Sequence, residues 1–292
     1  MLSVNEAIAA LLSQAPCLAD REPCGLFDSL GRVLADDVIA AIDVPPADNS
    51  AMDGYALRHA DWTDAETALP LSQRITAGST PGELEPGSAA RIFTGAEVPA
   101  GADTVVMQEH CEGDQAGVNI LKLPSMGANI RRQGQDIESG QHVLSAGQRL
   151  RPQDVGLIAS LGLASVVVYR PLRVAILSTG DELIEPGQAA GPGQIYNSNR
   201  FTMQGQLSAW GFEVVDLGVA RDRPDTVRKY LTRAAEQADV IITSGGVSVG
   251  EEDHVKDVVD SLGSLELWRI AIKPGKPFAF GQVLGKPFLG LP

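Results

Sequence analysis

Residues 172–182 read LRVAILSTGDE, an apolar strand that runs directly into a loop of serine, threonine, glycine and two carboxylates. A helix is predicted next over about Asn199–Trp210, with Asn197 or Ser198 as its N-cap. A further strand is predicted at Phe212–Leu217. Strand, helix and strand in succession are typical of a parallel sheet whose strands are joined by helical crossovers.

The residues that follow repeat this alternation. A helix is expected to begin at Asp225, the strand Val240–Thr243 runs into a glycine-rich loop, and another helix is expected over about Asp253–Leu262. Three more strands are expected near residues 265–272, 278–280 and 288–289. We therefore expect a three-layer α/β domain over residues 172–292, with a mostly parallel sheet covered on both faces.

The residues before 172 have a different character. From about residue 48 to 150, short apolar runs alternate with glycine and proline and no helical pattern is present, which favours a separate all-β domain, a small barrel or sandwich. A strand is also predicted from Gly31 to Val44. The other apolar runs are Leu71–Ile75, Ala90–Phe93, Thr104–Met107, Val118–Leu123 and His142–Leu144.

The N-terminus predicts an amphipathic helix. Ser3 and Glu6 stand three residues apart, the spacing of a capping box, and apolar residues follow at helical intervals. Such a helix has an apolar face, so it needs a partner surface on which to pack.

Composition and charge exclude several classes of protein. Lys and Arg number 23 against 37 Asp and Glu, a net charge of −14, which argues against a nucleic-acid partner because phosphates require a basic face. The longest apolar stretches, such as Leu161–Tyr169, fall short of the ~20 residues that cross a bilayer, so no membrane partner is expected. Cys17, Cys24 and Cys111 form no CxxC pair, and their odd number suits a reducing compartment, so we expect a cytoplasmic protein. The four scattered histidines do not have the spacing of zinc ligands, which excludes a zinc enzyme. The cysteine pattern likewise excludes a disulfide scaffold.

Two loops follow the carboxyl ends of predicted parallel strands, where ligands bind in open α/β sheets. One is Thr179–Glu182 and the other runs from Ser244 to Asp253; each combines glycine with carboxylates. Glycines let backbone N–H groups approach an anion, and carboxylates suit Mg²⁺, so the loops favour a phosphate or metal site. Tight turns followed by acidic helix caps would produce the same pattern.

Basic and polar residues mark further candidate positions. Lys273 and Lys276 flank a Pro-Gly turn and resemble an anion clamp, although a solvated turn has the same composition. Arg131 near Asp136 offers a second basic point, although surface arginines are common. Asp48–Tyr55 gathers polar groups around a Met and a Tyr, which fits either a functional loop or an Asx-rich connection.

The chain resembles the molybdopterin molybdenumtransferase family, which includes MoeA and the E domain of gephyrin. The resemblance rests on eight segments that run in order across nearly the whole chain. They are DNSAMDGY (48–55), RIFTG (91–95), GADTVVMQE (101–109), NIRRQGQD (129–136), STGDEL (178–183), QIYNSNR (194–200), TSGGVSVGEED (243–253) and IKPGKPFAF (272–280).

The resemblance implies an enzyme of the last step of molybdenum cofactor synthesis. It would take adenylated molybdopterin, use Mg²⁺ and molybdate, insert molybdenum at the dithiolene and release AMP. It also implies a homodimer, with the active site between the α/β domain of one subunit and the β domain of the other, and an adenylyltransferase as a partner. The implied domains are an N-terminal helix (1–26) packing on the α/β domain, a β linker domain (27–47 and 137–171), an inserted all-β domain (48–136) and a molybdopterin-binding α/β domain (172–292).

Site residues carry over from the matching motifs. The resemblance implies catalytic roles for Asp53, Thr94, Asp136, Glu182, Asp222 and Asp253. It implies binding roles for Arg131, Thr179, Gly180, Ser244, Gly245, Gly246, Ser248, Lys273 and Lys276. Our assignment within these sets is that Glu182 and Asp253 hold Mg²⁺, while the two lysines and the amides of Gly245 and Gly246 hold phosphate or molybdate.

Two departures and three alternatives accompany this interpretation. Position 269 is Arg where several relatives carry Lys, and the chain stops at Gly290-Leu291-Pro292 where the family continues, so we expect a C-terminally truncated chain. A molybdopterin adenylyltransferase or a CinA-like module would share only the α/β part, and residues 48–136 argue against both. A non-catalytic molybdopterin-binding or scaffold protein, as gephyrin is when it clusters receptors, remains the alternative from another class.

Overall fold

The computed structural model describes residues 1–114, 117–246, 254–271 and 277–291. They form two compact units. Met1–Pro23 and Val167–Pro292 make up the first, which we call the α/β unit, and Cys24–Val166 make up the second, the β-rich unit. Among the described residues, none of the helices combines the length and the apolar character needed to cross a membrane.

A six-stranded sheet in the order β17-β14-β18-β21-β20-β19 forms the centre of the α/β unit. The strands are β14 (Arg173–Thr179), β17 (Glu213–Ala220), β18 (Val240–Ser244), β19 (Gly263–Arg269), β20 (Pro277–Val283) and β21 (Lys286–Leu291). β14 is parallel to β17 and β18, and β18 is parallel to β21, whereas β20 is antiparallel to both of its neighbours. The expected α/β class is therefore confirmed, with a mixed sheet in which the parallel pairs are the majority.

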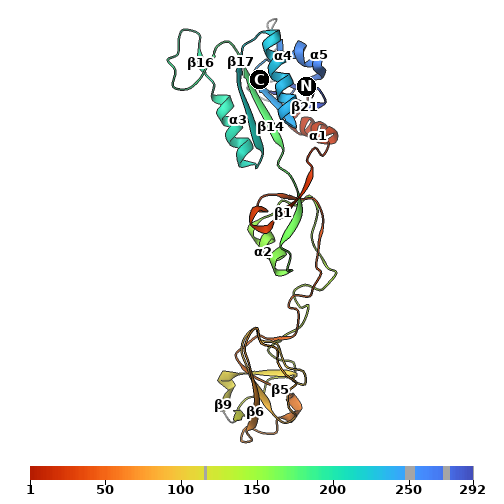
Figure 1. The fold of residues 1–292 in the computed structure, drawn as a ribbon, viewed down its shortest axis with the longest axis vertical. Helices are drawn as coiled ribbons and strands as arrows, with labels where there is room; N and C mark the ends of the chain where they lie inside the picture. The colour runs from red at the N-terminus through yellow and green to blue at the C-terminus, as the bar shows by residue number, and fades with distance from the viewer. Residues whose placement is uncertain (115–116, 247–253, 272–276, 292) are drawn as a thin grey trace. The chain divides into compact units, whose positions relative to one another are not determined.

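Helices cover both faces of this sheet, as predicted (Figure 1). The helices are α1 (Val4–Gln14), α3 (Ser198–Ala209), α4 (Pro224–Gln237) and α5 (His254–Leu262). Alternate residues of β14 point to opposite faces: Val174 and Ile176 pack with Leu207 of α3, while Ala175 and Leu177 join the core under α4 and α5. This two-sided burial explains why β14 is apolar along nearly its whole length.

The N-terminal helix α1 begins with the predicted capping box. The Ser3 hydroxyl accepts from the Glu6 N–H at 3.2 Å, and the Glu6 carboxylate accepts from the Ser3 N–H at 2.7 Å. Leu2 forms a bridge to Ile270, and the Ala271 N–H donates to the Leu2 carbonyl at 2.7 Å. These contacts attach the start of the chain to the segment that follows β19.

The β-rich unit contains a six-stranded sheet in the order β8-β5-β7-β6-β10-β9. Its strands are β5 (Gly54–Leu57), β6 (Leu69–Ile75), β7 (Ala89–Ile92), β8 (Thr104–Met107), β9 (Cys111–Gly113) and β10 (Gly117–Ile120). Two apolar clusters form its core, one including Ile75 and Ile92 and the other including Leu57 and Val118. The expected all-β character of this region is thereby confirmed.

Shorter elements complete the chain. They are β1 (Arg21–Gly25), β2 (Val33–Leu34), β3 (Val38–Ile39), β4 (Asn49–Ser50), β11 (Ile130–Arg131), β12 (His142–Leu144), β13 (Ser165–Tyr169), β15 (Leu183–Ile184), β16 (Ile195–Tyr196), α2 (Pro152–Ser160) and the 3-10 turns Leu26–Asp28, His59–Asp61 and Gln108–His110. The strand predicted from Gly31 to Val44 is wrong as one element: it is split into β2 and β3, which pair with different partners. Helix α2 was not predicted, because its short apolar pattern was assigned to a β linker. The boundaries predicted at 26, 47, 136 and 171 stay predictions.

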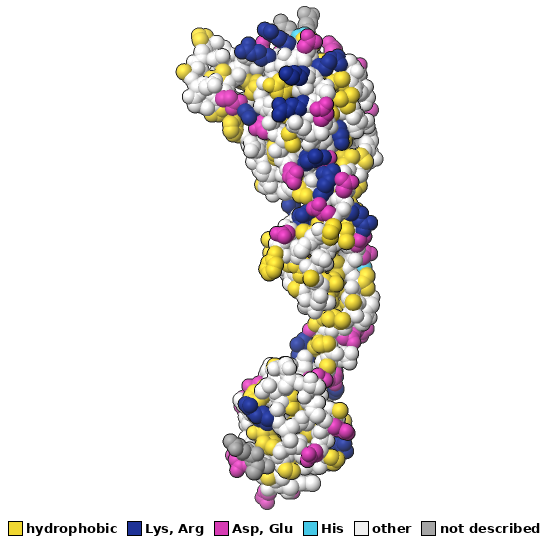
Figure 2. Space-filling view, viewed as in Figure 1, with side chains coloured by type: hydrophobic (Ala, Val, Ile, Leu, Met, Phe, Trp, Pro, Cys, Tyr) yellow, Lys and Arg dark blue, Asp and Glu magenta, His cyan; other side chains and the backbone are white. Residues whose placement is uncertain are grey.

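Charged side chains of both signs lie close together on the surface. On the visible face of the α/β unit, Lys and Arg are interspersed with Asp and Glu (Figure 2). Several of these charges are paired, as where Arg200 donates to Glu185 at 2.6 Å and to Asp216 at 2.8 Å. Local cationic positions therefore exist in a chain whose net charge is −14.

Candidate functional site

Two of the predicted loops meet in the α/β unit. β14 and β18 are neighbouring parallel strands, and Ser178 is the register partner of Ser244. Thr179 ends β14 and Ser244 ends β18, so Gly180 and Gly245 leave the sheet side by side. The sheet therefore brings the predicted binding residues Thr179, Gly180, Ser244, Gly245 and Gly246 to one edge.

Glycine is required where these loops touch. Gly245 and Gly246 have φ of +90° and +71°. A Cβ on Gly245 would lie 2.5 Å from the Thr179 carbonyl oxygen, and one on Gly246 would lie 2.2 Å from Val255 Cγ2. Both the backbone conformation and the space available thus exclude a side chain.

The roles assigned to the two glycine amides stay predictions, but the two amides differ in their present hydrogen bonds. The Gly245 N–H donates to the Leu291 carbonyl at 3.0 Å, so this amide is already used within the sheet edge. A ligand would have to displace that bond. The Gly246 amide has no such bond to a described residue and is the donor that remains.

The N-terminus of α3 is the third part of the site. Asn197 caps this helix, because its Oδ1 accepts from the Arg200 N–H at 3.3 Å, and the Ser178 hydroxyl donates to the same oxygen at 3.4 Å. Asn199 Nδ2 donates to Ser244 Oγ at 2.9 Å. Sequence reasoning identified Asn197 only as a helix cap and assigned no role to Asn199. Their position in the QIYNSNR motif was the signal that could have identified them.

Buried polar atoms without partners occur on both faces of the sheet near these strand ends. Thr179 Oγ1, Thr243 Oγ1 and Asn197 Nδ2 are buried and form no hydrogen bond to another described residue. The three residues are 4%, 0% and 2% exposed. A buried polar group without a partner costs about 1–3 kcal/mol. Because side chains alternate along β14 and β18, Thr179 and Thr243 lie on the sheet face covered by α4 and α5, whereas Asn197 begins α3 on the other face.

Carboxylates surround the first loop. A Cβ on Gly180 would lie 2.6 Å from Glu182 Oε2, so the Glu182 carboxylate folds back over the loop. Asp181 Oδ1 accepts from the Asp222 N–H at 3.4 Å, which brings the predicted Asp222 beside the same loop. Among the residues that the structure describes, no group of three or more His, Cys, Asp or Glu is arranged to hold a metal. Glu182 is thus one oxygen donor, and a complete Mg²⁺ site stays a prediction.

The β-rich unit places the other predicted residues in two pairs. Asp53 Oδ1 accepts from the Thr94 N–H at 2.8 Å and from the Thr94 hydroxyl at 2.7 Å. The hydrogen bond from the Thr94 backbone, followed by that from its hydroxyl, holds the pKa of Asp53 below its usual value. Arg131 forms an ion pair with Asp136.

The short strand β4 connects these two pairs. Asn49 and Ser50 pair with Arg131 and Ile130 of β11. On its other side, the Gly95 N–H donates to the Ser50 carbonyl at 2.8 Å. Segments around residues 50, 95 and 131 are therefore neighbours, although they are far apart in the sequence.

The remaining predicted residues, Ser248, Asp253, Lys273 and Lys276, lie outside the described residues.

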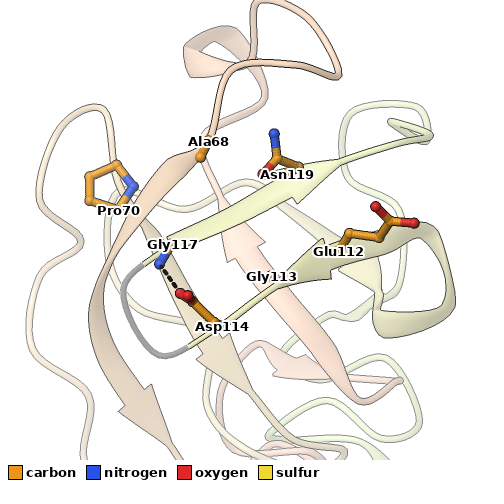
Figure 3. Close-up of a pocket in the computed structure, with 7 residues that line it drawn as sticks. All are labelled: Ala68, Pro70, Glu112, Gly113, Asp114, Gly117 and Asn119. Carbon is orange, nitrogen blue, oxygen red and sulfur yellow. Dashed lines mark hydrogen bonds between the residues drawn. The ribbon is translucent and has the colours of Figure 1, made fainter.

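A separate pocket of about 530 Å³ lies on the β-rich unit near β9 and β10 (Figure 3). The described residues that line it are Ala68, Pro70, Glu112, Gly113, Asp114, Gly117 and Asn119, and none of these is a predicted site residue. We therefore assign the candidate site to the strand ends and not to this pocket.

Comparison with known proteins shows the family to which the chain belongs. Residues 2–162 match the family model for the MoeA N-terminal region (domain I and II), and residues 175–292 match a probable molybdopterin binding domain. The molybdopterin molybdenumtransferase of Haemophilus influenzae is 45% identical over 294 residues, covering 100% of this chain and 72% of the relative. A Nostoc protein of the same name is 37% identical over 304 residues and is covered to 70%. The crystal structure of a molybdopterin biosynthesis MoeA protein from Pyrococcus horikoshii superposes with a TM-score of 0.87 at 33% identity, covering 100% of this chain and 74% of that one.

Proposed function

Because the chain belongs to the molybdopterin molybdenumtransferase family, we propose that it inserts molybdenum into molybdopterin, taking adenylated molybdopterin and molybdate as substrates and releasing AMP. The observation that carries this proposal is the meeting of two glycine-containing loops at the carboxyl ends of β14 and β18, where the buried, unpartnered Thr179 hydroxyl lies next to Gly246. Donors at the carboxyl edge of a parallel sheet suit an anionic substrate, and this one carries phosphates.

The α/β unit supplies donors to the substrate anion. The Thr179 hydroxyl and the backbone amide of Gly246 are the groups available for this role at the loops that follow β14 and β18, and the side-chain amide of Asn197 is available at the start of α3. The N-terminus of α3 adds a favourable dipole. Hydrolysis of the adenylate forms one P–O bond from a water oxygen and breaks one P–O bond of the phosphoanhydride, so that AMP leaves. Negative charge develops on the leaving phosphate, and fixed donors stabilise it because they need no reorganisation.

Carboxylate side chains would bind the Mg²⁺ ion that the reaction uses. Glu182 lies over the loop that follows β14 and offers the hard oxygen ligand that Mg²⁺ prefers. Mg²⁺ bound there with Asp253 would neutralise phosphate charge during the cleavage. The hydrogen bonds from Thr94 lower the pKa of Asp53, and we retain this carboxylate as a proposed catalytic group.

AMP release tests this function. The 292-residue chain would be incubated with adenylated molybdopterin and Mg²⁺, with and without molybdate, and AMP would be quantified by chromatography. We expect molybdate-dependent release that EDTA abolishes and added Mg²⁺ restores. Retention of the adenylated pterin without any release would instead identify a binding or scaffold protein, the alternative from another class.

A charge-neutral variant tests the metal assignment. Glu182→Gln should raise the Mg²⁺ concentration for half-maximal rate by about tenfold, since an amide is a weaker ligand than a carboxylate. The matched control is Glu236→Gln, an exposed site on α4 that should behave as the parent. An unchanged Mg²⁺ dependence of Glu182→Gln would contradict the assignment.

The assembly of the enzyme is the last part of the proposal. We propose a homodimer and transfer of the adenylated pterin from a molybdopterin adenylyltransferase. Sedimentation of the chain at several concentrations tests the first point. A change in AMP release when the adenylyltransferase is present tests the second.

A further inference from the structure

Two arginines converge on one aromatic ring in the β-rich unit. The guanidinium carbon of Arg74 lies 4.8 Å from the ring centroid of Phe93, and that of Arg91 lies 4.7 Å from the same centroid. Arg74 of β6 and Arg91 of β7 are register partners on neighbouring strands, so the two side chains leave the sheet side by side. Like charges placed opposite each other on a sheet repel, and the Phe93 ring shared by the two guanidinium groups offsets part of that repulsion.

The two arginines differ in what else they contact. Arg91 donates to the Gly54 carbonyl at 2.9 Å and to Gln108 Oε1 at 2.7 Å, and it also lies 5.0 Å from the ring of Tyr55. Arg74 is exposed, and no hydrogen bond or ion pair joins it to another described residue. Arg91 is therefore fixed in place, while Arg74 presents unused N–H donors to solvent.

This pair adjoins the predicted catalytic pair of the same unit. Phe93 directly precedes Thr94, which holds the Asp53 carboxylate at 2.7 Å. The charge of Arg91 also acts on Asp53, where it adds to the larger effects of the Thr94 hydrogen bonds in lowering the pKa. A ligand on Arg74 and Phe93 would therefore lie next to a group implicated in turnover.

We propose that Arg74 and Phe93, supported by Arg91, form a subsite for a planar nitrogen heterocycle that carries a phosphate. The proposal rests on the proposed function, whose substrate contains two such parts, an adenine nucleotide and a pterin phosphate. A guanidinium plane stacks on a heterocycle and donates to phosphate oxygens at its edge, which a lysine does not reproduce. A bound phosphate would also offset the repulsion between the two arginines.

Four variants test the subsite in the full chain. Arg74→Ala removes the guanidinium, Arg74→Lys keeps the charge without the plane, and Phe93→Leu keeps apolar bulk without the ring. The matched control is Arg58→Ala, which removes an exposed charge directly after β5, the opposite end of the strand from Asp53. Thermal melting would verify that each variant is folded.

Calorimetry with three probes, AMP, molybdopterin and inorganic phosphate, measures the effect. We expect Arg74→Ala to weaken binding of AMP or molybdopterin by about tenfold, with Arg74→Lys and Phe93→Leu retaining phosphate affinity but losing part of the affinity for the ring compound. Loss for AMP assigns the subsite to the nucleotide, and loss for molybdopterin assigns it to the pterin.

Two results would overturn the proposal. If Arg74→Ala binds AMP and molybdopterin with the same affinity as Arg58→Ala, the proposed subsite is wrong. If Arg74→Ala loses the same affinity for all three probes and Phe93→Leu has no effect, Arg74 contributes only its charge and the subsite for a heterocycle is wrong. AMP release by the parent chain is measured in parallel. If the parent releases AMP and Arg74→Ala has the same KM as the parent, the subsite alone is rejected. If the parent releases no AMP, the proposed function itself is rejected.

Discussion

At the scale of single residues, the site depends on close approach between loops. Gly245 lies so close to Thr179 that a Cβ on it would be 2.5 Å from the Thr179 carbonyl oxygen, and Asn199 joins α3 to Ser244. Neither contact is between sequence neighbours. The residue types that matter here, glycine without a Cβ and a short amide with both donor and acceptor, suit a corner where backbone and side chains meet closely.

Gly245→Ala should destabilise the α/β unit by about 3 kcal/mol, because it adds a collision with the Thr179 carbonyl to the cost of a positive φ. Gly187→Ala is the control, since Gly187 has φ +94° but nothing within 4 Å of the new Cβ. That variant should lose only about 1–2 kcal/mol. Urea unfolding measures both, and equal losses would mean that the contact with Thr179 carries no cost.

Asn197 has two roles that substitutions can separate. Asn197→Ser keeps an oxygen that can cap α3 but removes the amide donor, so substrate binding should weaken by about tenfold with little loss of stability. Asn197→Ala removes both groups and should also cost about 1 kcal/mol of stability. Substrate affinity and urea unfolding are compared for the two variants. Normal affinity in Asn197→Ser would show that the amide does not face the substrate.

At the scale of elements, one ion-pair group ties together the starts of strands β14 and β18. Asp239, whose side chain is 5% exposed, accepts from Arg170 Nη1 at 2.6 Å and from the Arg173 N–H at 2.9 Å. Burial raises the pKa of Asp239, but the hydrogen bonds from Arg170 and Arg173 outweigh it and hold the pKa well below its usual value. The carboxylate therefore stabilises the folded state in its charged form.

Asp239→Asn should destabilise the α/β unit by about 3 kcal/mol near pH 7, since it leaves Arg170 without its main partner. The folded pKa lies below the unfolded value of about 4, so the stabilisation is complete above that value and is lost as pH falls below it. The difference in unfolding free energy between parent and variant should then shrink below about pH 4. Glu236→Gln is the control, and a difference that does not change with pH would contradict the role given to the charge.

At the scale of the whole molecule, each unit has its own apolar core. Leu231 of α4 lies in the cluster under α4 and α5, and Leu57 of β5 lies in a cluster of the β-rich unit; both are 0% exposed. Units with separate cores are able to unfold in separate transitions. A single free energy of unfolding would then not describe the chain.

Leu231→Ala and Leu57→Ala test this independence. Each should lower the stability of its own unit by about 2–5 kcal/mol and leave the other transition in place. Hydrogen exchange during urea unfolding assigns each transition to its peptides. One cooperative transition that moves equally in both variants would show that the units unfold together.

The order and type of the main elements could be predicted because they depend on local patterns. The capping box at Ser3, the apolar run of β14 and the cap at Asn197 are each contained within a few residues. Helix α2 and the break between β2 and β3 could not be predicted from the sequence, because a short segment takes its conformation from the residues against which it packs.

The sequence by itself determined the α/β alternation, the all-β region and the family, because periodicity and motif order are properties of the chain alone. Only the tertiary structure decided which residues meet: Asn199 with Ser244, Asp53 with Thr94, and Arg74 with the ring of Phe93. It also showed that the Gly245 amide is already bonded to Leu291. The reason is physical: contacts between distant segments follow from strand register and the direction of each side chain, and no local pattern in the sequence specifies them.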